Sequence, residues 1–152
     1  MDLGISGRTA LITGGSLGIG KATAAELAAE GVNVAIVARD RTRLEDAAQE
    51  LSSNTGGRVI GIAGDMGDAS DIARAVDEAS TALGGIDILV NNAGSSPAGR
   101  IEDLDDDIWM ASFELKFMGY MRLSRAVLPA MRAQKWGRIV NIIGGGGHSP
   151  RP

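Results

Sequence analysis

Glycines recur in the stretch TGGSLGIG, from Thr13 to Gly20, directly after an apolar run. Residues without a Cβ let backbone approach a phosphate closely, and the start of a helix supplies N–H groups and a positive dipole end. In this spacing Gly14 allows the tight turn, Gly18 the approach of phosphates and Gly20 the close packing of the following helix. Glycine-rich turns alone are weak evidence, but the strand–turn–helix context favours a dinucleotide pyrophosphate site over a purely structural turn.

Arginines follow the second apolar run, VNVAIVA, in the sequence RDRTR. An acid at the end of this strand would bind the ribose hydroxyls of NAD, but Ala38 stands there and Arg39 follows it. A guanidinium fork fits a 2′-phosphate, so the pattern favours NADP(H) over NAD, and the preference depends on Arg39 alone. The alternative is that Arg39, Arg41 and Arg43 are a solvated helix start, partly neutralised by Asp40.

Other chemistry is restricted by composition. The chain has no cysteine and one histidine, His148, which excludes disulfides, thiolate-metal sites and histidine-rich metal sites. His148 could donate a proton, but no carboxylate is identifiable to orient it, so a loop residue is the simpler interpretation. The acidic run Glu102–Asp107 has the charge density of a cation site, and complementation of a helix dipole explains it more simply.

The overall charge argues against nucleic acid and membrane partners. The 152 residues carry a net charge of −4, and no apolar run approaches the ~20 residues that span a bilayer. The N-terminus lacks the pattern of a signal peptide. We therefore expect a cytoplasmic protein.

Short β-branched runs alternate with helical patterns along the whole chain. Strands are predicted over residues 9–14, 32–38, 58–65, 86–94 and 137–143, and helices over 19–30 and from 105 to about 133. Two further helices are indicated by apolar residues at helical spacing: Leu44, Ala47, Ala48 and Leu51 in one, and Ile72, Val76, Ala79 and Leu83 in the other. This alternation predicts one α/β domain over residues 1–152, a Rossmann-type, doubly wound parallel sheet between two helix layers.

At these residues the sequence resembles the short-chain dehydrogenase/reductase family. TGGSLGIG matches the family's TGxxxGxG motif, residues 91–94 match its NNAG motif, and Asp65 stands at its acidic position after the third strand. The resemblance implies a hydride-transferring oxidoreductase with NADP, or NAD, as cofactor and a small carbonyl or alcohol as substrate. It also implies that Asn91 and Asn92 steady the sheet, and their amides would in any case satisfy backbone groups at strand ends. The cofactor-binding residues expected from motif and resemblance are Gly14, Ser16, Leu17, Gly18, Ile19, Gly20, Arg39, Asp65, Met66, Asn92, Ala93 and Gly94.

The family's catalytic residues do not carry over. Lys116 stands where the family has an asparagine and Gly144 where it has a serine, and the tyrosine and lysine would fall beyond Pro152. Tyr120 is followed four residues later by Ser124 rather than lysine, so we interpret Tyr120 as a packing or interface residue. Lys116 is either a positive charge near the reacting oxygen or a solvated helix residue.

The catalytic residues are therefore unknown. We expect the 152 residues to be the N-terminal part of a longer family member and to be inactive alone. A non-catalytic dinucleotide-binding module or regulatory subunit is the alternative function, and a scaffold whose glycine turn binds nothing ranks last.

The long helix also bears on assembly. Trp109, Phe113, Phe117, Met121 and Leu128 lie near one another by helical turn. We expect this pattern to be chiefly core, while the length of the helix suits the helix-pair dimer contact that the family resemblance implies. A homo-oligomer, dimer or tetramer, is therefore predicted.

Overall fold

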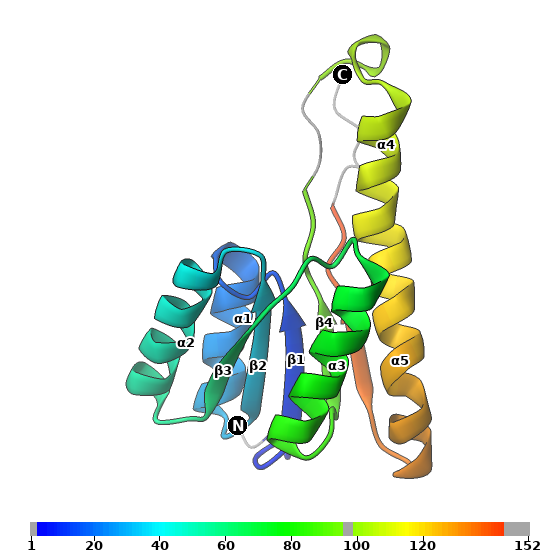
Figure 1. Ribbon diagram of the computed structural model, residues 1–152. Coiled ribbons are helices and arrows are strands. Elements are labelled where there is room, and N and C mark those ends of the chain that lie inside the picture. The colour runs from blue at the N-terminus through cyan, green and yellow to red at the C-terminus, as the bar shows by residue number, and fades with distance from the viewer. Residues whose placement is uncertain (1–2, 96–98, 145–152) are drawn as a thin grey trace.

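The computed structural model describes residues 3–95 and 99–144, and Figure 1 shows their arrangement. Five parallel strands form one sheet in the order β3-β2-β1-β4-β5. The strands are β1 (Thr9–Thr13), β2 (Asn33–Ala38), β3 (Val59–Ala63), β4 (Ile88–Asn91) and β5 (Arg138–Asn141). The helices are α1 (Gly18–Ala29), α2 (Arg41–Thr55), α3 (Ala69–Leu83), the 3-10 turn η1 (Ile101–Asp103), α4 (Asp106–Phe113), the π-helical turn η2 (Glu114–Met118) and α5 (Gly119–Ala133).

Alternate residues of the strands face two helix layers. Ala10 and Ile12 of β1 pack in one cluster with residues of α1 and α2, while Leu11 packs in a second cluster with residues of α3 and α5. Burial on both faces, which is typical of parallel sheets, explains the continuous apolar runs of β1, β2 and β4, whereas β5 is largely exposed. The predicted doubly wound α/β fold is thus confirmed. Among the described residues, no helix combines the length and apolar character needed to cross a bilayer.

The order in which strands are added to the sheet changes side at β1. From β1 the chain adds β2 and β3 on one side, and then crosses to add β4 and β5 on the other. Ligands of such sheets bind at the carboxyl ends of the strands, where the connections that follow two neighbouring strands run to opposite sides of the sheet. Here that place lies beyond Thr13 and Asn91, the last residues of β1 and β4.

The predicted elements are all present: the strands are somewhat shorter than predicted, α1 is shifted by one residue, and α2 and α3 extend beyond the apolar residues that indicated them. Leu44, Ala47, Ala48 and Leu51 of α2 are buried, as the spacing predicts. The long helix predicted from residue 105 to about 133 is present, and the five-residue π turn η2 lies within it, between α4 and α5. A π turn adds one residue to a helical turn without leaving the helical path, so apolar spacing alone does not distinguish it from an α-helix.

The aromatic face of the long helix is more exposed than the sequence predicts. Trp109, Phe113, Phe117 and Met121 are 37–64% exposed and Leu128 is half-buried, so the expectation that they are chiefly core is wrong. For Trp109 and Phe113 the physical reason is visible in Figure 1, where α4 extends beyond the carboxyl ends of the strands and so does not lie against the sheet.

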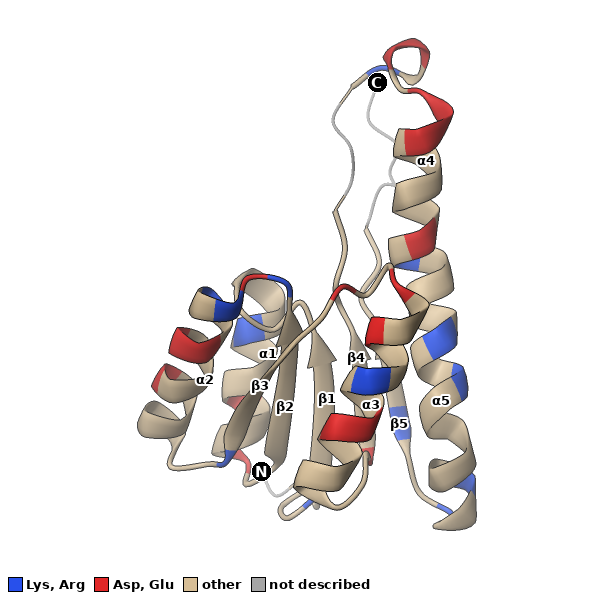
Figure 2. Cartoon of the chain, in the orientation of Figure 1, with Lys and Arg blue, Asp and Glu red and all other residues tan. Residues whose placement is uncertain are grey.

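Acidic residues gather at the start of α4, and basic residues lie along α5 (Figure 2). The Asp105 carboxylate accepts a hydrogen bond from the Ile108 N–H at 3.0 Å, and Asp106 and Asp107 occupy the first turn. This cap explains part of the acidic run by helix-dipole complementation.

Candidate functional site

The turn after β1 is packed against its own backbone. The N–H groups of Gly14 and Gly15 donate to the Val37 carbonyl at 2.8 and 3.2 Å. Gly14 has a φ of +66°, and a Cβ on Gly20 would overlap the carbonyl oxygen of Gly14. Side chains are therefore excluded at these two positions by backbone conformation and by space.

Gly18 differs from these two glycines. Its φ is +53°, and a Cβ there would meet nothing within 4 Å. The space above the turn is open at Gly18, which is the arrangement expected where backbone must approach a ligand rather than another part of the chain.

The N-terminus of α1 lacks a side-chain cap. Leu17 precedes the helix and makes no capping hydrogen bond, whereas Asp40, Asp68 and Asp105 cap α2, α3 and α4 through their carboxylates. No acidic residue lies in the first turn of α1 either. The N–H groups of this turn and the positive end of the helix dipole therefore remain suited to an anion from outside the chain.

Thr13 and Asn92 bind the ends of β1 and β4 together. The Thr13 hydroxyl accepts from the N–H groups of Asn92 and Ala93, each at 3.0 Å, and donates to the Val90 carbonyl at 3.4 Å. In return the Asn92 amide donates to the carbonyls of Thr13 and Gly14 at 3.0 and 3.2 Å. The interpretation of Asn92 as satisfying backbone groups at strand ends is confirmed, while the matching role of Thr13 was not foreseen.

Asn91 connects the sheet to α5. Its buried amide nitrogen donates to the Asn141 side-chain oxygen at 2.8 Å and to the Ser124 hydroxyl at 3.3 Å. Within the described part of the chain its side-chain oxygen is buried without a hydrogen-bond partner. Asn91 therefore joins side chains of β5 and α5 rather than backbone groups, which differs from the strand-end interpretation.

A cavity of about 290 Å³ lies at the carboxyl ends of the strands, beside the α1 N-terminus. Of the predicted cofactor residues, it is lined by Gly14, Ser16, Leu17, Arg39, Asp65, Met66, Ala93 and Gly94. The other four are not among its lining residues: Gly18 and Ile19 are exposed at the helix start, while Gly20 and Asn92 support the turn. Sequence reasoning missed the lining residues Val37, Ala38, Asp40, Arg43, Gly64, Ser95 and Leu115.

The three arginines after β2 have different surroundings. Arg43 forms an ion pair with Asp40 at 3.4 Å, and Arg41 lies 3.9 Å from Glu45. Arg39 is exposed, lines the cavity and forms no ion pair with any described residue. Partial neutralisation by Asp40, considered as an alternative above, therefore applies to Arg43 and not to Arg39.

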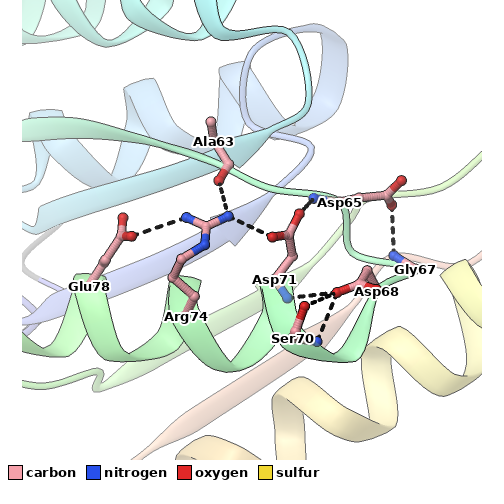
Figure 3. A network of polar contacts seen from close by, with 8 residues as sticks. All are labelled: Ala63, Asp65, Gly67, Asp68, Ser70, Asp71, Arg74 and Glu78. Carbon is pink, nitrogen blue, oxygen red and sulfur yellow. Dashed lines mark hydrogen bonds and ion pairs between the residues drawn. The ribbon is translucent and has the colours of Figure 1, made fainter.

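The loop from β3 to α3, which carries Asp65, is held by the polar network in Figure 3. The Asp71 carboxylate accepts from the Asp65 N–H at 2.8 Å and from Arg74 at 2.7 Å. Arg74 also donates to the Ala63 carbonyl at 2.9 Å and to Glu78 at 3.0 Å. The hydrogen bond from Asp65, followed by that from Arg74, lowers the pKa of Asp71 below its ordinary value.

Asp65 is a turn residue that also borders the first cavity, and its part in cofactor binding stays a prediction. Its side chain accepts from the Gly67 N–H at 2.9 Å, as a turn residue does, and it also lines the cavity. Next to it, Asp68 caps α3, and the Ser70 hydroxyl and the Asp71 N–H hold the pKa of Asp68 low.

A second cavity, of about 410 Å³, lies between the η2–α5 helix and the segment after β5, and Lys116 and Gly144 line it. Tyr120 also lines this cavity, and its hydroxyl donates to the Ile142 carbonyl at 3.1 Å. Burial raises the pKa of Tyr120, so the phenol stays protonated as a donor, in agreement with the packing role predicted for it. His148 lies outside the described residues.

Comparison with known proteins adds three findings. Residues 8–152 match the family model described as short chain dehydrogenase. The chain is 37% identical over 153 residues to (2S)-[(R)-hydroxy(phenyl)methyl]succinyl-CoA dehydrogenase subunit BbsD of Thauera aromatica, covering 97% of this chain and 61% of that protein. It is 36% identical over 139 residues to D-beta-hydroxybutyrate dehydrogenase of Cupriavidus necator, covering 91% and 53%.

Solved structures agree with these relatives. L-sorbose reductase from Gluconobacter frateurii, complexed with NADPH and L-sorbose, superposes with a TM-score of 0.89 at 41% identity, covering 93% of this chain and 54% of that one. A short chain dehydrogenase from Burkholderia cenocepacia in complex with NADP gives a TM-score of 0.86 at 35% identity, covering 97% and 60%. The chain thus spans between half and about three-fifths of the length of these proteins.

Proposed function

The chain belongs to the short-chain dehydrogenase family. On that basis we propose that it is the coenzyme-binding part of an oxidoreductase that prefers NADP(H) and acts on a small carbonyl or alcohol. The observation that carries this proposal is the uncapped N-terminus of α1 beside a glycine turn and a cavity. Backbone N–H groups and a helix dipole without an internal acceptor suit a pyrophosphate.

The lining of the first cavity supports one orientation of the dinucleotide. Gly18 and the start of α1, where a Cβ would meet open space, would hold the pyrophosphate. Asp65 and Met66 would border the adenine, and Ala93 and Gly94 the nicotinamide end. The residues therefore fit the group, with Gly20 and Asn92 acting through the shape of the turn rather than by contact.

Arg39 supports the preference for NADP(H). It is the one cavity-lining arginine without an ion pair among the described residues, so its guanidinium can take a 2′-phosphate without first leaving an acid. The NADPH and NADP complexes of the two solved relatives are in line with this preference.

When bound, the nicotinamide supplies or accepts a hydride, and the residues of this chain bind and orient it. No general acid or base is assigned: Tyr120 is engaged with the Ile142 carbonyl, and Gly144 offers no side chain. The names dehydrogenase and reductase among the relatives favour an enzyme over the non-catalytic module.

Assembly and location stay predictions. The exposed apolar residues of α4 and η2, Trp109, Phe113 and Phe117, support a homo-oligomer formed through this helix. A cytoplasmic location is expected from the sequence alone.

The proposal is tested by fluorescence titration of the purified protein with NADPH and NADH, comparing Arg39→Gln with Arg41→Gln. A charged hydrogen bond contributes ~1.5–3 kcal/mol, so Arg39→Gln should weaken NADPH binding about tenfold or more and leave NADH binding within about twofold. Arg41, which lies near Glu45, is the matched control and should change neither. Absence of saturable binding of both coenzymes to folded protein would refute the proposed function, and equal losses in both variants would refute the role of Arg39.

A further inference from the structure

The second cavity is lined by one cationic side chain and otherwise by uncharged residues. Its lining includes apolar side chains such as Phe117 and Ile142, the neutral polar residues Tyr120, Ser124 and Asn141, and one cation, Lys116. None of the described residues that line it is acidic. An apolar space with a single ammonium group favours a ligand that has an apolar body and one negatively charged oxygen.

The π turn η2 places Lys116 between the two cavities. Leu115 lines the first cavity and Lys116, the next residue, lines the second. The Lys116 stem lies across Gly94: a Cβ on Gly94 would come within 2.8 Å of Lys116 Cε and 3.4 Å of its Cγ. Gly94 lines the first cavity at the end proposed for the nicotinamide. The Lys116 side chain thus lines the second cavity while its stem lies against Gly94 of the first.

This π turn is held by contacts with the loop between β3 and α3. Arg122 donates to the Glu114 carboxylate at 2.6 Å and lies 3.5 Å from the Gly67 carbonyl, with 19% of its own side chain exposed. A Cβ on Gly119 would overlap the Met66 carbonyl oxygen, so helix and loop backbones are in direct contact. The turn is thus clamped to the loop that carries Asp65, which holds Lys116 in a defined position. Such π turns often occur at functional sites.

We propose that Lys116 binds an anionic oxygen of the small molecule held in the second cavity, so that the site selects substrates carrying a carboxylate. This inference rests on the proposed function, because the second cavity can hold a substrate only if the nicotinamide binds at the Gly94 end of the first cavity. Its physical content, an anion subsite made by Lys116, is measured separately from coenzyme binding.

The test uses two probes of one shape, hexanoate and hexanamide, titrated calorimetrically into the purified protein at low salt, with and without NADPH. One charge-assisted contact gives about tenfold in affinity, so hexanoate should bind about tenfold more tightly than hexanamide. In Lys116→Met the affinities for hexanoate and hexanamide should differ by no more than about twofold, and Lys116→Arg should largely keep the preference for hexanoate. Arg125→Met removes an exposed cation of α5 that does not line this cavity, and the preference should stay unchanged.

Equal binding of the two probes by the unaltered protein would overturn the inference, as would a preference that survives Lys116→Met or disappears in Arg125→Met. Circular dichroism of each variant confirms that the fold is kept, and Lys116→Arg repeats the comparison if Lys116→Met does not fold. Failure to bind NADPH, with the hexanoate preference intact, would refute the coenzyme proposal while supporting the anion subsite.

Discussion

Replacement of Thr13 by valine tests how the two strand ends are held at the site. Valine has the shape of threonine but no acceptor, so the N–H groups of Asn92 and Ala93 each lose a hydrogen bond of 3.0 Å. An unsatisfied buried group costs ~1–3 kcal/mol, and because Asn92 and Ala93 are partly exposed we take about 1–2 for each. Burial of the extra methyl returns ~0.8 kcal/mol. The expected net loss of unfolding free energy is about 1–3 kcal/mol.

Stability alone does not isolate this cause, so Thr13→Ser is the matched control. Serine keeps the acceptor and removes a methyl group from a side chain that is 0% exposed, at a cost of ~0.5–1.5 kcal/mol. Urea unfolding gives both losses, and amide hydrogen exchange resolved at Asn92 and Ala93 separates them. In Thr13→Val these two amides should exchange at least about tenfold faster than in Thr13→Ser, after correction for global stability. Equal protection of both amides in the two variants would refute the reasoning.

Two further predictions concern stability. Lys135, after α5, is the one described non-glycine residue with positive φ, at 57°, and Lys135→Gly should raise the unfolding free energy by about 0.5–1 kcal/mol in urea melts, whereas Lys135→Ala should not. The lowered pKa of Asp71 means that its contribution to stability is complete above the unfolded-state pKa and is lost as the pH falls through the folded-state value. Asp71→Asn should therefore flatten the decline in melting temperature between about pH 5 and pH 2, and an unchanged pH profile would contradict the role of the Asp65 and Arg74 contacts.

The cofactor end of the site could be predicted from sequence because it is built from backbone. The positive φ of Gly14 and Gly18 disfavours a side chain, and the carbonyl oxygen of Gly14 leaves no room for one at Gly20, so each position requires a glycine in the sequence. Strands β1, β2 and β4 were predictable for a related reason, since strands covered on both faces require continuous apolar runs. Thr13 was missed because a buried hydroxyl at a strand end has the same sequence pattern as a β-branched core residue.

The long helix was predictable in extent but not in detail. Its apolar spacing indicates one face, yet that face lies against the sheet only in α5, where Leu123, Val127 and Met131 are buried. In α4 the same spacing continues beyond the sheet, so Phe113 and Trp109 are exposed. Helical periodicity indicates that one face of a helix is apolar, but it does not indicate what covers that face. The prediction that the aromatic residues of α4 belong to the core was wrong for this reason.

The second cavity shows why the other end of the site could not be predicted. Its residues come from η2 and α5 and from the segment after β5, and they meet because β5 pairs with β4 in the register Asn91↔Asn141. Lys116, in the π turn η2, lines this cavity, and its stem lies against Gly94, 22 positions earlier in the chain. A glycine attributed to the nucleotide thus also makes room for a lysine. Where one residue serves two neighbouring cavities, spacing within a motif explains its type for the first cavity and is silent about the second, so the chemistry of that end has to be derived from the fold.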